Sequence, residues 1–222
     1  KILLIAWRNI WRNKRRSLLS VLAVAISCAL LIFMMALQKG SYADMIDHTV
    51  RAHTGHIQIQ HVDYLEDRDL ASAVSAPGDI IKAVCHMPHV LAVTPRVNAA
   101  ALVSKEKRTF GAMIFGIDPT YEKEASTLSE AITDGAWLEA GDREGALMGK
   151  MLARNLKAAV GDEIVFFGQG RDGSIAAGKL FVRGIYSFGA DELDRSTMVA
   201  PLATIQEAFS MDDSVSEIAL LL

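Results

Sequence analysis

Two glycine motifs in the second half of the chain are the first candidates for chemistry on a nucleotide. The segment 168–173 reads G-x-G-x-x-G, which binds a dinucleotide pyrophosphate when a helix begins at the glycines. An apolar strand pattern at 163–167 precedes it, but a second strand pattern at 179–186 follows in place of a helix. We therefore predict a glycine-rich hairpin loop and no dinucleotide site.

The segment 173–179 nearly matches the phosphate loop G-x-x-x-x-G-K-S/T. Position 180 is Leu, so the hydroxyl that would bind Mg²⁺ is missing, and again no helix follows. We expect no ATP hydrolysis by this chain.

Histidines and cysteines are the remaining candidates for metal or nucleophilic chemistry. They fall on two stretches, His48, His53, His56 and His61 on the first and Cys85, His86 and His89 on the second. Neither stretch contains H-E-x-x-H or a Cys-x-x-Cys pair, and the chain has no G-x-S-x-G. We expect hydrogen-bonded or solvated histidines, no catalytic residue, no metal site and no cofactor. Two cysteines in 222 residues also exclude a disulfide framework.

Phe33, Met34 and Leu37 indicate a different chemistry, the binding of hydrocarbon chains. They are large, apolar and within about one helical turn of one another, so they could face an apolar substrate. The alternative is that they face bulk lipid. Gly40 follows them and lowers helix propensity by about 1 kcal/mol relative to Ala, which makes it a plausible flexing point.

These three residues belong to a long apolar segment. No formal charge occurs between Arg16 and Lys39, and 20 residues at about 1.5 Å each span roughly the 30 Å of a bilayer core. We predict a transmembrane helix over 17–38, with Leu18, Leu22, Ile26, Leu30, Phe33 and Leu37 in the span. A cleaved signal peptide is the alternative, but its apolar region is normally only about 7–15 residues long.

Charge is distributed unevenly around this span. The whole chain has a formal net charge of −3, yet residues 1–16 carry six basic side chains and no acidic one. The positive-inside rule places that end in the cytoplasm and the residues after about 40 outside it. We predict an interfacial amphipathic helix over 1–16 that contacts lipid and, as the sharper alternative, a cytoplasmic partner. Its contact residues would be Trp7, Arg8, Trp11, Arg12, Arg15 and Arg16.

The remaining chain is acidic, so we expect no nucleic-acid binding. Helical spacing continues over 39–54 and predicts a stalk, and 55–222 is expected to form the outer domain. Strands are expected at 55–61, 90–94, 97–104, 109–116, 145–148, 163–167, 179–186, 196–200 and 216–222. Helices are expected at 78–87, 150–159 and 202–209, with 121–136 helical or irregular. Because strands and helices alternate without a regular repeat, the fold class is α+β.

Six segments in order resemble one family. They are AWRNIWRNKRRS at 6–17, GHIQI at 55–59, GKMLARNL at 149–156 with VGDEIV at 160–165, FVRGIYS at 181–187 and the Pro-Leu pair at 201–202. Together they resemble the N-terminal portion of MacB/LolC-type ABC transporter permeases, the FtsX-like permease family. The resemblance covers nearly the whole chain.

This resemblance implies an inner-membrane permease with four transmembrane helices. After the first helix it implies a two-lobed α+β periplasmic core domain, which would be residues 55–222 here. The lobe nearer the membrane would be formed from both ends of the domain, and helices two to four would follow residue 222. ATP and Mg²⁺ would be bound by a separate ABC ATPase subunit, and its motion would be transmitted through the stalk. Further implied partners are a second permease copy or paralogue and a lipoprotein or periplasmic carrier.

The function expected from this resemblance is the extraction of lipoproteins from the inner membrane towards the outer membrane. The alternatives are a MacB-like efflux or envelope process and a single-span sensor or adaptor with a ligand-binding outer domain. A membrane-anchored hydrolase is a weaker alternative, because no nucleophile arrangement is present.

Overall fold

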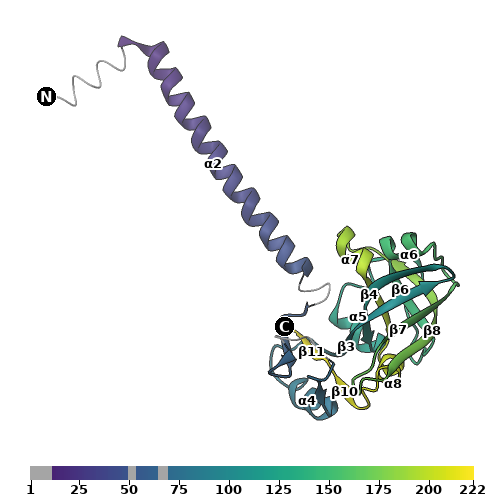
Figure 1. The fold of residues 1–222 in the computed structure, drawn as a ribbon. Coiled ribbons are helices and arrows are strands. Elements are labelled where there is room, and N and C mark those ends of the chain that lie inside the picture. Colours follow the sequence, from purple (N-terminus) through teal and green to yellow (C-terminus); the bar gives the residue numbers. More distant parts are fainter. Residues whose placement is uncertain (1–11, 50–53, 65–69) are drawn as a thin grey trace. The chain divides into compact units, whose positions relative to one another are not determined.

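The computed structural model describes residues 12–49, 54–64 and 70–222, which divide into two units, 1–48 and 49–222. The described part of the first unit is dominated by one helix, α2 (Lys14–Thr49), which continues without interruption through Gly40 (Figure 1). At 1.5 Å per residue its 36 residues extend about 54 Å, more than the roughly 30 Å core of a bilayer. The predicted span and most of the predicted stalk therefore form a single helix.

The second unit mixes strands and short helices, as expected for an α+β domain. Its strands are β1 (Ile57–Gln60), β2 (Val74–Ser75), β3 (Ala92–Lys105), β4 (Arg108–Ile117), β5 (Ile132–Gly135), β6 (Gly145–Gly149), β7 (Glu163–Gln169), β8 (Ile175–Tyr186), β9 (Thr197–Pro201), β10 (Ser214–Val215) and β11 (Glu217–Leu221). Its helices are α4 (Pro77–Val84), α5 (Pro119–Ala125), α6 (Lys150–Leu156), α7 (Asp191–Ser196) and α8 (Leu202–Ala208).

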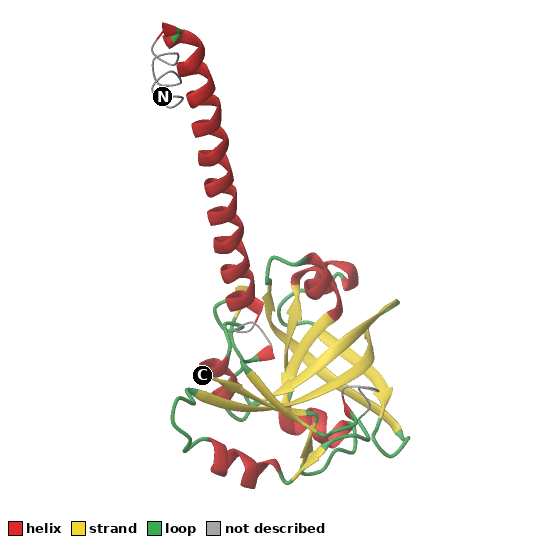
Figure 2. Cartoon of the chain, turned by 90° about the vertical axis from the view of Figure 1, so that its left-hand side faces the viewer, coloured by secondary structure: helices red, strands yellow, loops and turns green. Residues whose placement is uncertain are grey.

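Nine strands form one sheet, and six of them close into a ring. The order β1-β11-β3-β4-β9-β6-β8-β5 is completed by β7, which pairs with both β3 and β8 (Figures 1 and 2). Ring pairings are antiparallel except for the parallel pairs β4·β9 and β6·β8. A closed ring has no free edge in its wall, and the edges of the sheet are β1 and β5, which lie outside the ring.

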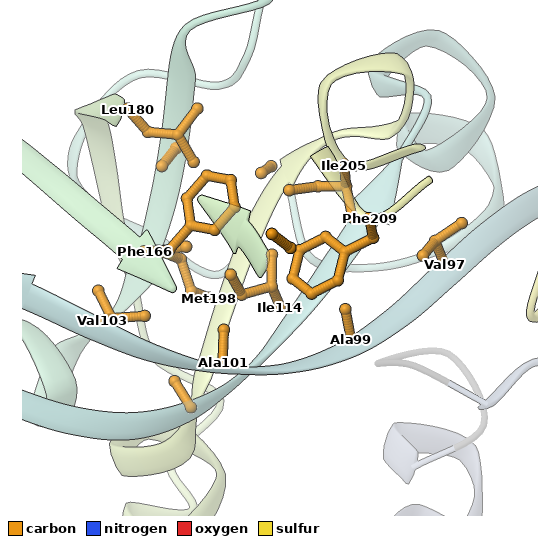
Figure 3. Packing of buried hydrophobic residues seen from close by; sticks show 14 of the residues in the cluster. Val97, Ala99, Ala101, Val103, Ile114, Phe166, Leu180, Met198, Ile205 and Phe209 are labelled. Atoms are coloured by element: carbon orange, nitrogen blue, oxygen red, sulfur yellow. The ribbon is translucent and has the colours of Figure 1, made fainter. Parts of the chain in front are cut away.

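The main core fills the inside of this ring. Every second residue of β3 from Val97 to Val103 points inward, towards the other strands and α8 (Figure 3). Phe166 stacks on Phe209 with ring centroids 5.9 Å apart. A second, smaller cluster outside the ring includes Leu128, Leu138, Leu147 and Val199.

The sequence divides β3 into two strands at Pro95-Arg96, but the structure has one strand of 14 residues. Proline cannot donate a ladder hydrogen bond, and a charged residue is unusual in a buried strand. The strand continues through Pro95 because β11 pairs with this half of β3. Arg96 can be buried because the carboxylates of Glu122 and Glu217 lie beside its guanidinium. The two lobes implied by the resemblance consequently share one sheet through β3.

The other expected elements are present with small boundary changes. The region 121–136 contains the end of α5 and then β5, and the hairpin strands β7 and β8 extend into the predicted glycine-rich loop. The sequence missed α7 and the two-residue pair β2·β10. These elements are too short to produce a recognisable periodicity.

Candidate functional site

The surface of α2 is apolar over a length that water cannot solvate favourably. The segment Lys14–Tyr42 contains an 18-residue stretch with a mean hydropathy of 2.7 and is long and apolar enough to cross a membrane. The predicted span residues Leu18, Leu22, Ile26, Leu30, Phe33 and Leu37 are all exposed. Such an unbroken apolar surface requires an apolar environment, since each buried methylene contributes about 0.8 kcal/mol.

The polar side chains inside this segment are satisfied by the helix itself. Ser20 Oγ donates to Arg16 O at 3.0 Å, and Ser27 Oγ donates to Ala23 O at 2.8 Å. Hydroxyls bonded to the preceding turn can enter hydrocarbon without an external partner. Ser20 and Ser27 therefore need no hydrogen-bond partner from a second helix.

Phe33, Met34 and Leu37 are brought onto one face of α2. Leu37 lies four residues after Phe33 and three after Met34, the spacings at which helical side chains are neighbours. All three are more than half exposed, which leaves them available to a lipid or an acyl chain. Their contact with a substrate stays a prediction.

The basic residues at the start of α2 lie at the positive end of the helix dipole, where cations are unfavourable. Arg12, Arg15 and Arg16 are exposed, and the first turn contains no acidic residue. Cations at a helix N-terminus are unfavourable by about 0.3–1 kcal/mol each, so the helix itself does not explain them. Anionic lipid headgroups would compensate this cost. Trp7, Arg8 and Trp11 lie outside the described residues.

The two ends of the second unit meet in one strand pair. β1 begins eight residues after α2 ends and pairs antiparallel with β11, with Ile57 opposite Leu220. His56 N donates to Leu220 O at 2.8 Å, and Leu222 N donates to His56 Nδ1 at 3.2 Å. Any displacement of the chain at β1 therefore acts directly on β11. We name the pair β1·β11 the terminal strand pair.

A buried ionic cluster connects the terminal strand pair to the ring. Arg96 on β3 is 1% exposed and holds Glu122 of α5 in a bidentate pair, Nη2–Oε1 at 2.7 Å and Nε–Oε2 at 3.0 Å. On the other side Arg96 Nη1 lies 3.8 Å from Glu217 Oε1 of β11. Gln60 of β1 donates to Glu217 Oε2 at 3.1 Å. We name these four residues the Arg96 cluster.

The two carboxylates of the Arg96 cluster are shifted in opposite directions. Burial opposes ionisation of Glu122, but the charge and hydrogen bonds of Arg96, with hydrogen bonds from Ser126 and Thr94, outweigh it and lower its pKa. Burial raises the pKa of Glu217, and Arg96 offsets only part of this because its charge is shared with Glu122. Glu122 is thus the carboxylate that stays ionised beside Arg96. Glu217 is the carboxylate that is protonated more easily.

Two buried acceptors in this region lack a hydrogen-bond donor among the described residues. They are Glu217 Oε1 and Asn98 Oδ1, while Asn98 Nδ2 donates to Tyr64 OH at 3.3 Å. An unpaired buried acceptor costs about 1–3 kcal/mol. The hydrogen-bonding groups around the Arg96 cluster are therefore less fully satisfied than those inside the ring. The sequence analysis missed the cluster, although Arg96 inside an apolar strand was a signal that could have indicated it.

The nucleotide and metal alternatives find no support in the geometry. Gln169 pairs with Ile175, so the G-x-G-x-x-G segment is the turn of the β7–β8 hairpin, as predicted. The described residues contain no group of three His, Cys, Asp or Glu side chains that could hold a metal ion. In the same part of the chain Cys28 and Cys85 are free and exposed.

Comparison with known proteins identifies this architecture. Residues 17–222 match the family model for the MacB-like periplasmic core domain. The lipoprotein-releasing system transmembrane protein LolC of Xylella fastidiosa, in strains Temecula1 and 9a5c, is 27% identical over 215 residues. The match covers 90% of this chain and 49% of that protein, so the chain spans about half the length of the curated relatives it matches.

Two solved structures share the fold. The extracellular domain of the noncanonical ABC-type transporter YknZ from Gram-positive bacteria matches with a TM-score of 0.51 at 16% identity, covering 70% of this chain and 78% of that one. The periplasmic region of MacB from Actinobacillus actinomycetemcomitans matches with a TM-score of 0.50 at 14% identity, covering 75% and 66%.

Proposed function

The chain belongs to the MacB-like periplasmic core domain family, and on that premise we propose that it is the N-terminal part of an ABC transporter permease that releases lipoproteins from the inner membrane. The observation that carries the proposal is the terminal strand pair with the Arg96 cluster behind it. Among the relatives, the lipoprotein-releasing LolC proteins support this branch over efflux. A MacB-like efflux or envelope process is the alternative, supported by fold similarity alone.

In this mechanism the chain transmits motion and binds no nucleotide. A separate ABC ATPase subunit would hold ATP and Mg²⁺ and act on the basic end of α2 in the cytoplasm. The 36-residue helix would carry the displacement to β1, whose hydrogen bonds to β11 pass it to both ends of the periplasmic domain. Arg96 then couples these strands to β3 and hence to the ring.

The apolar face of α2 would provide the cargo contact. Phe33, Met34 and Leu37 would hold acyl chains near the outer leaflet, where each buried methylene contributes roughly 0.8 kcal/mol. A few such contacts suffice to distinguish a lipidated protein from an unlipidated one. A second permease copy or paralogue would complete the cavity, and a periplasmic carrier would accept the released lipoprotein.

The test is site-specific photo-crosslinking in the complete permease, reconstituted with its ATPase in proteoliposomes that contain a lipoprotein. Photoreactive groups at positions 33, 34 and 37 should give lipoprotein adducts that decrease when ATP drives release. A group at Leu19, exposed near the other end of the span, is the matched control and should react with lipid only. Lipid adducts alone at all three positions would reject the cargo contact.

A further inference from the structure

Strand register places Glu217 between two polar side chains. It is opposite Gln60 of β1 on one side and Arg96 of β3 on the other, and directly opposite residues of antiparallel strands share a face. Gln60 Nε2 donates to Glu217 Oε2 at 3.1 Å, and Arg96 Nη1 lies 3.8 Å from Glu217 Oε1. This row of three residues links the terminal strand pair to the ring through side chains.

The charges of the Arg96 cluster do not cancel when both of its carboxyls are ionised. The side chains of Arg96, Glu122 and Glu217 are 1%, 3% and 4% exposed, so one buried cation faces two buried anions. Arg96 donates two hydrogen bonds to Glu122, whereas its contact with Glu217 is too long for one. A buried charge without its own partner is strongly unfavourable, and binding of a proton neutralises it.

Hydrogen bonding around Glu217 favours the same proton. Among the described residues, Glu217 Oε1 and Asn98 Oδ1 are buried acceptors that no donor reaches. The side-chain amide of Asn98 lies beside the Glu217 carboxyl. A protonated carboxyl carries one O–H donor, so a proton on Oε1 supplies a donor where both orphaned atoms are acceptors.

We propose that Glu217 is a proton switch that holds or releases the terminal strand pair. With the proton on Oε1, the Arg96 cluster is neutral and β11 stays packed against β3. When that proton passes to water, Glu217 keeps a buried negative charge that the nearby Glu122 repels. Local separation of β11 from β3 exposes Glu217 to water and relieves this charge, so deprotonation favours release.

The groups that face Glu217 come from three elements. Burial raises its pKa most, and the charge of Glu122 on α5 adds to this effect. The charge of Arg96 on β3 and hydrogen bonds from Gln60 on β1 and Asn98 on β3 act in the opposite direction without cancelling it. The balance therefore favours the protonated carboxyl in the closed strand pair.

The segment after β1 carries the other titratable side chains near this row. His61 and Asp63 are 47% and 67% exposed, and their charged ends lie 3.5 Å apart. Tyr64 is buried, and its OH accepts a hydrogen bond from Asn98 Nδ2 at 3.3 Å. His61 directly follows Gln60, so the experiment must separate its titration from that of Glu217.

The switch lies on the route of the proposed transmission, and this consequence rests on the proposed function. Motion that arrives at β1 would pass through β11 to Arg96 and the ring. Coupling along this route would be strongest while Glu217 holds its proton and would weaken as pH rises.

Hydrogen exchange of the full chain in lipid nanodiscs at a series of pH values tests the switch. The protection of β1 and β11 amides is corrected for the intrinsic exchange rate at each pH. In the wild type it should fall by up to about tenfold per pH unit above about 4.5, because opening releases one proton. The amides of β7 and β8 should show no such change.

Two variants assign the effect to one residue. Glu217→Gln has no proton to release, so protection of β1 and β11 should become independent of pH. His61→Gln is the matched control and should keep the pH dependence of the wild type. A dependence that persists in Glu217→Gln, disappears in His61→Gln, extends equally to β7 and β8, or is absent from the wild type would overturn the proposal.

Direct titration of the wild type provides a test that depends on no variant. Carbon-13 NMR of the Glu217 carboxyl should give a titration midpoint above 4.5, and a midpoint at or below 4.5 contradicts the switch. Neither measurement needs an ATPase, ATP or cargo. A negative result here is therefore separable from a negative result for lipoprotein release.

Discussion

At the scale of single residues, Arg96 decides how the domain is held together. Its guanidinium is buried between carboxylates from α5 and β11, and both contacts link elements that are far apart in sequence. A buried ion pair is weak support for stability as a whole, but removal of one partner leaves an uncompensated charge. Removal of any one charged residue of the Arg96 cluster should therefore destabilise the protein.

Replacement of Glu122 by Gln should destabilise the protein by about 3–5 kcal/mol, because Arg96 loses its bidentate partner inside the protein. The measurement is the free energy of unfolding in denaturant. Glu207→Gln, which breaks the exposed Arg143–Glu207 pair, is the control and should cost less than about 1 kcal/mol. Equal losses in the two variants would contradict the buried role of Glu122.

Glu217 should make stability depend on pH with the opposite sign to Glu122. Burial raises the pKa of Glu217 above its ordinary value of 4.5, so its contribution is fully present below that value and is lost as pH rises through the folded-state pKa. The lowered pKa of Glu122 gives a contribution present above 4.5 and lost as pH falls through its folded-state pKa.

The Glu217→Gln variant isolates this effect. The free energy of unfolding of the variant, relative to that of the wild type, should increase as pH rises above about 4.5. The reason is that the variant has no carboxylate at position 217 that must ionise while buried. Denaturation curves at a series of pH values measure the difference. A difference that is constant with pH would show that Glu217 is not perturbed.

At the scale of elements, the ring closes because small residues alternate with large ones across neighbouring strands. Phe166 of β7 is opposite Gly178 of β8, and the ring of Phe166 occupies the space that a side chain at 178 would take. Packing of this kind fixes the β7–β8 hairpin against the core. Gly111 of β4 differs from Gly178, since a Cβ at position 111 would face open space.

Gly178→Ala should lower the free energy of unfolding by about 1–3 kcal/mol, because its Cβ would lie 2.6 Å from the ring of Phe166. Gly111→Ala, also on a strand but with no atom within 4 Å of the new Cβ, is the control. We expect the control to be neutral or slightly stabilising. Thermal unfolding of both variants measures the difference, and indistinguishable melting temperatures would argue against close packing at 178.

At the scale of the whole molecule, the chain combines a membrane-capable helix with an independently packed domain. α2 exposes its apolar side chains along the whole predicted span, whereas the second unit buries its own around the ring. The covalent connection between them is short, because Ile57 follows Thr49 by eight residues. The proposed transmission of motion through β1 and β11 would use this connectivity.

The orientation in the membrane is predicted by charge. A reporter fused after Asp63 should be active outside the cytoplasm, because six basic residues precede the span. Acidic replacements of Arg12, Lys14, Arg15 and Arg16 should weaken or invert this orientation. A cytoplasmic signal from the unaltered fusion would refute the predicted topology.

The sequence alone was sufficient for the features that depend on local pattern. The 22 residues 17–38 are uncharged and mostly apolar, which by itself predicts a helix able to span a membrane. Alternation of apolar and polar residues predicted most strands of the ring. The G-x-G-x-x-G segment was correctly assigned to a hairpin, because the strand pattern after it excludes a helix. The ordered motifs also predicted the family that the comparisons confirm.

Tertiary structure decided the features that depend on distant residues. Pro95 and Arg96 suggest a strand end in the sequence, and only the carboxylates of Glu122 and Glu217 make Arg96 compatible with a continuous β3. Closure of the ring likewise depends on β7 pairing with β3, more than 60 positions earlier in the chain. The local sequence marks Arg96 as unusual but does not identify its partners, and it gives no sign of the β3–β7 pairing. Charge compensation and strand closure are properties of segments that only folding brings together.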